Sequence, residues 1–254
     1  MYIRIDGKQV EAKKWDTILT AARRAGIEIP SLCYHPALET AAACRMCVVE
    51  VFQDGWSGSR TVASCDYKVS EGLEVSTHTE NIQKLRQSTI ELLLARAPAS
   101  TALRKLADDF KLPTRSLPLV PDAGNCILCL LCTRVCEQMG CHAISVAGRG
   151  EKRFISTPYS ALSDTCIGCG ACARICPTNC IEMTETSNTI TIWGREFERV
   201  KCDACGAPLI SKAYREYAIA SRELSDDYYS QCPECKRNET AQKFSGLLLK
   251  VHHG

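Results

Sequence analysis

Cysteine is the residue that dominates the possible chemistry of this chain. Eighteen of its 254 residues are cysteine, and most of them occur in short C-x2-C steps. Near the N-terminus, Asp6 and Gly7 stand where a signal peptide would need its apolar stretch, so we expect a cytoplasmic chain with reduced thiols. Clustered thiolates are soft, anionic ligands, and they favour iron–sulfur clusters or zinc over a disulfide scaffold.

The cysteines form four groups along the chain, and two of these groups are copies of one motif, C-x2-C-x2-C-x3-C. In two-cluster ferredoxins the fourth cysteine of each copy binds the cluster of the other copy. Cys176 is followed by proline, as in that motif, whereas Cys136 is followed by Glu137. The motif predicts two [4Fe–4S] clusters, one bound by Cys126, Cys129, Cys132 and Cys176, and the other by Cys136, Cys166, Cys169 and Cys172.

Cys141 and Cys180 remain outside these ligand sets. They occupy equivalent places, a few residues beyond the fourth cysteine of each copy. We expect both to pack as small apolar side chains against the clusters. The alternative is that one of them replaces a ligand.

The N-terminal cysteine group has the spacing C-x10-C-x2-C-x17-C. Plant-type [2Fe–2S] ferredoxins use C-x4-C-x2-C and a distant fourth cysteine, so the wider first gap leaves room for a longer loop. Zinc is the alternative, although zinc sites usually pair two short knuckles. The group predicts a [2Fe–2S] cluster bound by Cys33, Cys44, Cys47 and Cys65.

The C-terminal cysteine group has the spacing C-x2-C-x26-C-x2-C, which is two knuckles joined by a long polar insert. Two such knuckles typically build a tetrahedral zinc site of four thiolates. A further iron–sulfur cluster and a redox dithiol are the alternatives. We expect one structural zinc ion bound by Cys202, Cys205, Cys232 and Cys235.

The elements that must position these cysteines can be read from periodicity and turn residues. Alternating residues around an Asp-Gly pair predict an N-terminal hairpin, and a second hairpin follows at 48–63. A short capped helix is expected from Asp16 or Thr17 to Ala25. Residues 80–112 have helical spacing with a break at Pro98, and the insert of the last group is expected to be helical.

These elements predict an α+β chain of four parts. The first is a [2Fe–2S] domain, the second a helical linker, the third a two-[4Fe–4S] ferredoxin-like domain, and the fourth a zinc-ribbon-like segment with its tail. Residues 113–125, rich in proline, are expected to be irregular. The expected boundaries are 1–78, 79–120, 121–190 and 191–254.

Charge and motif content exclude several other classes. The formal charge is +2, from 31 basic and 29 acidic residues, so a nucleic-acid binder is not indicated. No apolar run approaches the roughly 18–20 residues needed to span a membrane. Gly168-x-Gly170-x-x-Ala173 loosely matches a dinucleotide fingerprint, but cluster cysteines occupy two of its variable positions. We find no P-loop and no catalytic residue.

Residues 42–51, together with the order of the motifs, resemble a known family. They are similar to the N-terminal [2Fe–2S] domain of the large iron–sulfur subunit of respiratory NADH dehydrogenase, of NAD-linked formate dehydrogenases and of iron–iron hydrogenases. The resemblance continues through Thr89–Leu94 to Ile181 and implies a β-grasp fold for the first domain.

One departure from that family concerns the segment after the Glu-Leu-Leu-Leu helix. The family carries a His-x3-Cys-x2-Cys-x5-Cys cluster there, but this chain has Ala97, Thr101, Arg104 and Phe110 at the matching positions. We therefore expect an ordinary helix or loop without that cluster.

The segment from Cys202 to Cys235 is similar to the tail of the ferredoxin subunits of formate hydrogenlyase. The resemblance implies an electron-transfer subunit that works between a flavoprotein handling NAD(P)H and a hydrogenase or formate dehydrogenase catalytic subunit. Two alternatives stay open: reductase chemistry at Cys141 or Cys180, and an iron–sulfur or zinc redox sensor or assembly module without through-transfer.

Overall fold

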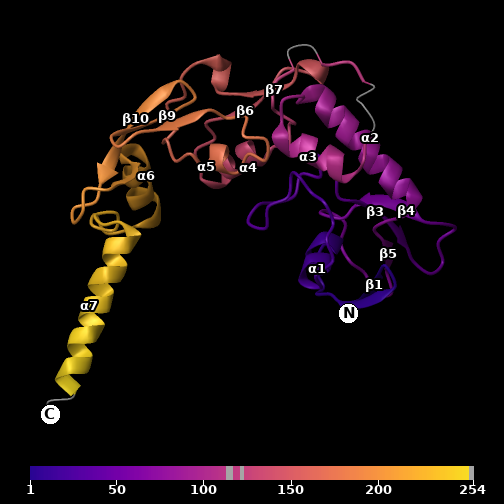
Figure 1. The fold of residues 1–254 in the computed structure, drawn as a ribbon, viewed down its shortest axis with the longest axis horizontal. Helices are drawn as coiled ribbons and strands as arrows, with labels where there is room; N and C mark the ends of the chain where they lie inside the picture. The colour runs from indigo at the N-terminus through magenta and orange to yellow at the C-terminus, as the bar shows by residue number, and fades with distance from the viewer. Residues whose placement is uncertain (113–116, 121–122, 252–254) are drawn as a thin grey trace. The chain divides into compact units, whose positions relative to one another are not determined.

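The computed structural model describes residues 1–112, 117–120 and 123–251, and Figure 1 shows its helices and strands. The expected irregular segment at 113–125 lies partly outside the described residues. The chain forms two compact units. The first comprises Met1–Gly140, Ile144–Ser156 and Cys172–Cys180, and the second comprises Cys141–Ala143, Thr157–Ala171 and Ile181–Gly254.

A five-stranded mixed sheet begins the first unit, in the order β2-β1-β5-β3-β4. Neighbouring strands are antiparallel except β1 and β5, which are parallel. The alternation that predicted the hairpins places Ile3 and Ile5 in the core while their neighbours face solvent. Both predicted hairpins are confirmed. The strands are β1 (Tyr2–Ile5), β2 (Lys8–Glu11), β3 (Val48–Phe52), β4 (Arg60–Ala63) and β5 (Glu74–Ser76).

Helix α1 (Ile18–Arg24) packs on this sheet. It begins after Thr17, whose hydroxyl accepts a hydrogen bond from the Thr20 backbone N–H, so the predicted cap is confirmed. Ile18 and Leu19 are fully buried in the same core as the strand residues. This core fixes the two ends of the long loop that carries Cys33 and Cys44.

Two helices follow the sheet, α2 (Glu80–Arg96) and α3 (Thr101–Asp109). The hydroxyls of Thr79 and Ser100 cap them, and the predicted break around Pro98 is confirmed. Ala97 and Leu103 are fully buried in a second core. Residues 101–109 of the segment in which the family carries its extra cluster form helix α3, which is one of the two structures that we expected there.

The duplicated cysteine motif lies in a region of short elements. Each copy of the motif enters a helix at its third cysteine, because Cys132 and Cys172 lie in the first turns of α4 and α5. A two-stranded ribbon, β6 paired with β7, follows the first copy. The elements are α4 (Leu131–Gln138), β6 (Ser145–Ala147), a 3-10 turn at Gly150–Lys152, β7 (Phe154–Ser156), a 3-10 turn at Pro158–Ser160, and α5 (Ala171–Arg174).

A four-stranded antiparallel sheet, in the order β11-β10-β9-β8, forms the centre of the second unit. Helix α6, capped by the Ser211 hydroxyl, lies in the insert between the two knuckles, so the predicted helical insert is confirmed there. The elements are β8 (Met183–Glu185), β9 (Thr189–Ile192), β10 (Arg195–Lys201), β11 (Pro208–Ser211), α6 (Lys212–Arg222) and α7 (Pro233–Val251).

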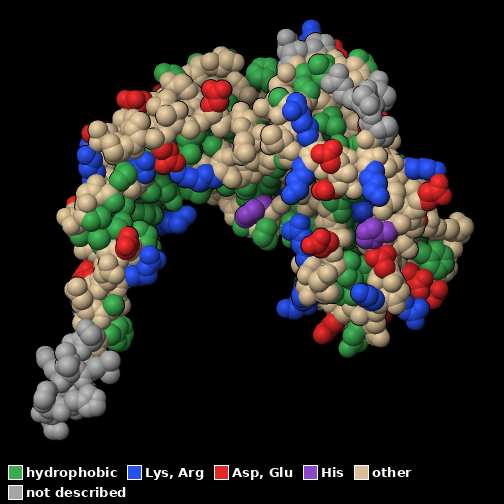
Figure 2. All heavy atoms as spheres, in the orientation of Figure 1, with side chains coloured by type: hydrophobic (Ala, Val, Ile, Leu, Met, Phe, Trp, Pro, Cys, Tyr) green, Lys and Arg blue, Asp and Glu red, His purple; other side chains and the backbone are tan. Residues whose placement is uncertain are grey.

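The elements of both units combine helices with mixed and antiparallel sheets, which confirms the α+β class. Positive and negative side chains are interspersed over the face drawn in Figure 2, in keeping with the small net charge of +2. Among the described residues, none of the helices is both long enough and apolar enough to cross a bilayer.

Candidate metal centres

The four cysteines of the N-terminal group lie in the interior of the first unit. Cys33 and Cys44 stand in the irregular loop after α1, Cys47 directly precedes β3, and Cys65 follows β4. Each is at most 3% exposed. Ala42 and Arg45 have positive φ angles of 48° and 58°, and these tight turns curl the loop around its own cysteines.

The pKa values of the four thiols are shifted in two pairs, Cys33 with Cys44 and Cys47 with Cys65. The Cys44 thiol lowers the pKa of Cys33 to about 6, and the Cys65 thiol lowers the pKa of Cys47 to about 6. Backbone N–H groups also point at sulfur: Cys44 N lies 3.4 Å from Cys33 Sγ, and Leu32 N lies 3.4 Å from Cys44 Sγ. Two pairs of thiolates with N–H donors form a donor set that fits two bridged irons.

A buried cation lies beside this group. Arg86 of α2 is 1% exposed, and its guanidinium donates to the Val48 carbonyl oxygen at 2.8 Å, one residue from Cys47. Its Nε has no hydrogen-bond partner among the described residues, and burial lowers its pKa. An arginine remains charged under these conditions, so this side chain offers positive charge to an anionic centre.

A second cysteine group surrounds a small enclosed cavity, also within the first unit. Cys126, Cys129 and Cys132 line it from the loop before α4 and from the helix itself, and Cys176 lines it from beyond α5. Ile127, Leu130 and Ile155 complete the apolar part of the lining. The structure thus brings together the four residues that the motif assigns to one [4Fe–4S] cluster.

The backbone of this loop is shaped to present N–H groups to sulfur. Leu128 and Leu130 have φ angles of 52° and 62°, a left-handed conformation that is uncommon for leucine. One result is a hydrogen bond of 3.4 Å from Leu128 N to Cys126 Sγ. Burial raises the pKa of Cys129 to about 11 and that of Cys132 to about 12, so cluster binding must displace protons from both.

Cys180 lies in this group as well. Its Sγ is 3.7 Å from Cys176 Sγ, and its backbone N–H donates to the same sulfur at 3.4 Å. Hydrogen bonding from the Cys180 thiol lowers the pKa of Cys126 to about 6 and that of Cys176 to about 5. The sequence placed Cys180 near a cluster, but it did not indicate the hydrogen bonds to the sulfur of Cys176.

The third predicted set draws its residues from both units. Cys136 and Cys172 belong to the first unit, and Cys166 and Cys169 belong to the second. Of the four, Cys172 is buried and the others are partly exposed. Their assignment to one [4Fe–4S] cluster stays a prediction.

The loop that carries Cys166 is held by the sheet of the second unit. The guanidinium of Arg195 donates to the Ser163 carbonyl at 2.8 Å and to the Cys166 carbonyl at 3.4 Å. Gly168 has a φ of +64°, and a Cβ there would lie 2.5 Å from the Phe197 ring. Glycine at this position is therefore explained by close packing, which supports the view that it is no nucleotide-binding fingerprint.

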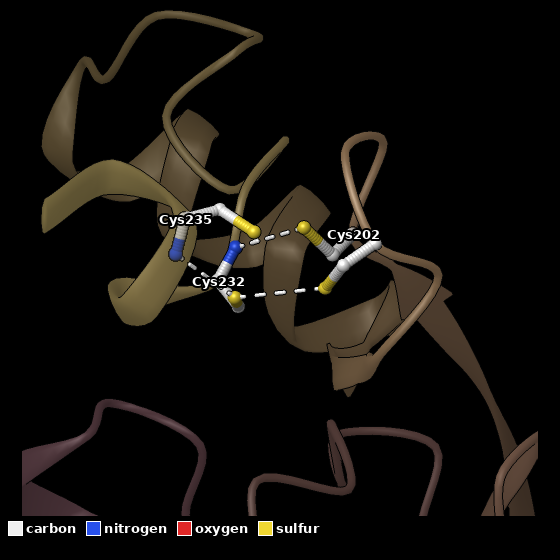
Figure 3. Close-up of side chains that lie close together, drawn as sticks. Cys202, Cys232 and Cys235 are labelled. Carbon is white, nitrogen blue, oxygen red and sulfur yellow. Dashed lines mark hydrogen bonds between the residues drawn. The ribbon is translucent and has the colours of Figure 1, made fainter. Parts of the chain in front are cut away.

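The last cysteine group forms one compact site in the second unit. The sulfurs of its four members, Cys202 and Cys205 on one knuckle and Cys232 and Cys235 on the other, all lie within 4.8 Å of one another. Figure 3 shows the sulfurs of the labelled residues gathered between the two knuckles. Cys232 N donates to Cys202 Sγ at 3.2 Å, and this bond lowers the pKa of Cys202 to about 6. The arrangement fits a four-thiolate metal site.

Arg134 of α4 connects the first two cysteine groups. Its guanidinium donates to the Cys33 carbonyl at 2.7 Å and to the Cys129 carbonyl at 3.4 Å, and also to the Glu39 carbonyl. Its Nε donates to the Leu130 carbonyl at 3.1 Å. One arginine thus binds main-chain oxygens of a predicted [2Fe–2S] ligand and of a predicted [4Fe–4S] ligand.

The same two groups share one hydrophobic core. Cys33, Cys44 and Cys129 pack in it, together with Met46 and Leu131. Ile90 of α2, Ala97 at the end of α2 and Leu103 of α3 close this core. The two candidate centres therefore adjoin each other inside the first unit.

Comparison with known families assigns a class to both regions. Residues 1–80 match the 2Fe-2S iron-sulfur cluster binding domain, and residues 120–183 match the 4Fe-4S dicluster domain. The chain therefore contains two ferredoxin-type iron–sulfur domains, and residues 184–254 lie outside both matches.

Individual relatives agree with this class. The NADPH-Fe(3+) oxidoreductase subunit alpha of Geobacter sulfurreducens is 32% identical over 200 residues, which are 69% of this chain and 23% of that protein. The NADH-ubiquinone oxidoreductase 75 kDa subunit of Reclinomonas americana is 28% identical over 213 residues, which are 74% of this chain and 30% of that protein. The chain thus spans less than a third of the length of these relatives.

A solved structure is similar as well. It is a chain of an NAD+-reducing [NiFe]-hydrogenase in the H2-reduced state, with 28% identity and a TM-score of 0.61 over 70% of this chain and 85% of that chain. The predicted resemblance to iron–sulfur subunits of NADH dehydrogenases and hydrogenases is confirmed.

Proposed function

We propose that this chain is an electron-transfer subunit that holds one [2Fe–2S] cluster in a β-grasp domain and two [4Fe–4S] clusters in a dicluster domain. The clusters supply the one-electron chemistry, and the chain sets their order and surroundings. The shared core of the first two cysteine groups, joined by Arg134, is the observation that carries the proposal. Two redox centres embedded in one rigid core suit transfer between them.

Cys126, Cys129, Cys132 and Cys176 would hold a [4Fe–4S] cluster beside the [2Fe–2S] cluster of the N-terminal group, and the two clusters would supply the redox chemistry of a direct transfer between them. Cys33 of the [2Fe–2S] set and Cys129 of the [4Fe–4S] set lie in the same core, so no intermediate centre is needed between them. A direct path between these two centres would not need the family's additional cluster, whose ligand positions are Ala97, Thr101, Arg104 and Phe110 in this chain. Electrons bypass helix α3, which serves to close the core.

The partners of the chain follow from the proteins to which it is similar. Their names pair NADPH, NADH or NAD+ with Fe(3+), ubiquinone or hydrogenase chemistry. We propose a cytoplasmic complex in which a flavoprotein exchanges electrons with NAD(P)H and a hydrogenase or formate dehydrogenase subunit carries the other catalytic site. The chain itself relays electrons between them.

The C-terminal site is proposed to bind a structural zinc ion in a zinc-ribbon-like segment. Its four sulfurs converge on one point, and Cys205 is exposed at the surface. The backbone N–H donors that reach the sulfurs of Cys202 and Cys232 also suit a tetrahedral tetrathiolate site. A fourth iron–sulfur cluster is the competing occupant of the same sulfurs.

Metal and sulfide analysis of the anaerobically purified chain, with low-temperature EPR after reduction, tests this assignment. We expect about ten irons and one zinc per chain, from one [2Fe–2S] cluster, two [4Fe–4S] clusters and one tetrathiolate site. About fourteen irons without zinc would move the last group to a cluster. A chain without iron would refute the function.

Rapid mixing of the assembled complex with NAD(P)H or hydrogen tests the relay itself. The [2Fe–2S] and [4Fe–4S] signals should be reduced and reoxidised within each turnover. Clusters that stay in one redox state while the partner subunits turn over would instead favour a sensor or assembly role.

A further inference from the structure

We propose that Cys180 is a fifth thiol at the [4Fe–4S] cluster of Cys126, Cys129, Cys132 and Cys176, where its S–H group donates to ligand sulfur and raises the reduction potential. This inference rests on the ligand set proposed above. It assigns a tuning role to a residue outside that set.

The position of the Cys180 side chain is the first support. It lines the same enclosed cavity as the four ligands. Its Sγ lies 3.7 Å from Cys176 Sγ, within the range of a hydrogen bond that involves sulfur, and its backbone N–H also donates to that sulfur at 3.4 Å. Cys126 lines the same cavity as Cys180.

The direction of the hydrogen bond follows from the chemistry of a bound cluster. Cysteine binds iron as a thiolate, which has no proton to donate. Of the sulfurs of Cys126, Cys176 and Cys180, only the last then keeps a proton, so it must be the donor. The Thr178 hydroxyl, 3.6 Å from Cys176 Sγ, is a second donor to the same ligand.

Such donors change the potential because reduction adds negative charge to the cluster and its sulfurs. A hydrogen bond to sulfur stabilises the more negative, reduced state more than the oxidised state. Loss of one donor should therefore make the cluster harder to reduce. The donor need not ligate iron, so its removal should leave the cluster intact.

Redox titration of the full-length chain, followed by EPR, tests this role with two variants of the same residue. Cys180→Ala removes the donor, and Cys180→Ser replaces it with a hydroxyl donor of similar size. In Cys180→Ala we expect the equilibrium of one [4Fe–4S] signal to shift about fivefold toward the oxidised form. That fold-change corresponds to about 40 mV for a one-electron couple. Cys180→Ser should stay close to the wild type.

Cys141 provides a matched control, because it occupies the equivalent place in the other copy of the motif and belongs to the second unit. Cys141→Ala should leave the Cys180-sensitive signal unchanged. Unchanged potentials in Cys180→Ala, or a loss of iron from that variant, would overturn the inference, since iron loss would make Cys180 a ligand. A wild-type chain without iron would overturn the proposed function as well.

Discussion

Arg134 offers the sharpest test of how the first two centres are held together. Arg134→Met keeps much of the aliphatic length of the side chain and removes every donor. The variant therefore leaves main-chain oxygens of Cys33, Glu39, Cys129 and Leu130 without their guanidinium partner. The two cysteine loops lose the hydrogen bonds that connect them through Arg134, while all of the cysteine ligands are retained.

The expected cost follows from the number and type of these bonds. A hydrogen bond from a charged donor contributes about 1.5–3 kcal/mol when it is well buried. Arg134 is half-buried, so water replaces part of each bond, and we expect a total loss of about 3 kcal/mol. For a unit of this size, 1 kcal/mol corresponds to roughly 2–4 °C in Tm, so the first unit should melt roughly 6–12 °C lower.

The assay combines anaerobic thermal unfolding, followed by the visible absorption of the clusters, with the rate of electron transfer. After rapid reduction of the [2Fe–2S] centre, the appearance of the reduced [4Fe–4S] signal should be slower in Arg134→Met than in the wild type. Arg134→Lys keeps the charge but cannot span several carbonyls at once, so it should lie between the two.

Arg104→Met is the matched control, because Arg104 is exposed on α3 and its Nε donates to the nearby Pro98 carbonyl at 3.0 Å. Its effect on stability should stay within about 0.5 kcal/mol. The reasoning is refuted if Arg134→Met has the same Tm as Arg104→Met and transfers electrons at the wild-type rate. The hydrogen bonds of Arg134 would then contribute neither to stability nor to electron transfer.

Three further changes probe the other centres. Arg86→Met removes the buried positive charge beside Cys47, so the reduction potential of the [2Fe–2S] cluster should fall. Redox titration followed by EPR measures this potential. An unchanged potential would show that the charge of Arg86 is screened. Gly168→Ala should destabilise the second unit by about 1–3 kcal/mol in thermal unfolding, because its Cβ would lie 2.5 Å from the Phe197 ring. The double variant with Phe197→Leu should recover part of this stability. A Gly168→Ala variant as stable as the wild type would contradict the close packing. Treatment with a zinc chelator should release one zinc and lower the thermal stability of the second unit without bleaching the iron–sulfur absorption, whereas bleaching would point to a cluster at the last cysteine group.

Much of the local structure could be predicted from the sequence because local chemistry determines it. Thr17 caps α1, which is one of the two caps that the sequence offered, and Thr79 and Ser100 cap α2 and α3 by the same local rule although they were not predicted. Pro98 separates α2 from α3 because proline cannot continue a helix. The sheet β8–β11 was not predicted, although its strands pair in sequence order and Thr189–Ile192 alternates as strands do. Strand β8 has only three residues and β10 is rich in charged side chains, and both features weaken the strand signal.

The cysteine spacing by itself determined which residues form groups and what kind of metal chemistry each group suits, because C-x2-C steps place sulfurs on one turn. Only the tertiary structure decided which groups adjoin. Arg134 donates to the Cys33 carbonyl across 101 positions of the chain, and Cys180 lines one cavity with the distant Cys126. Such contacts depend on how helices and loops pack. Packing involves many residues from distant parts of the chain, so no short sequence motif specifies it.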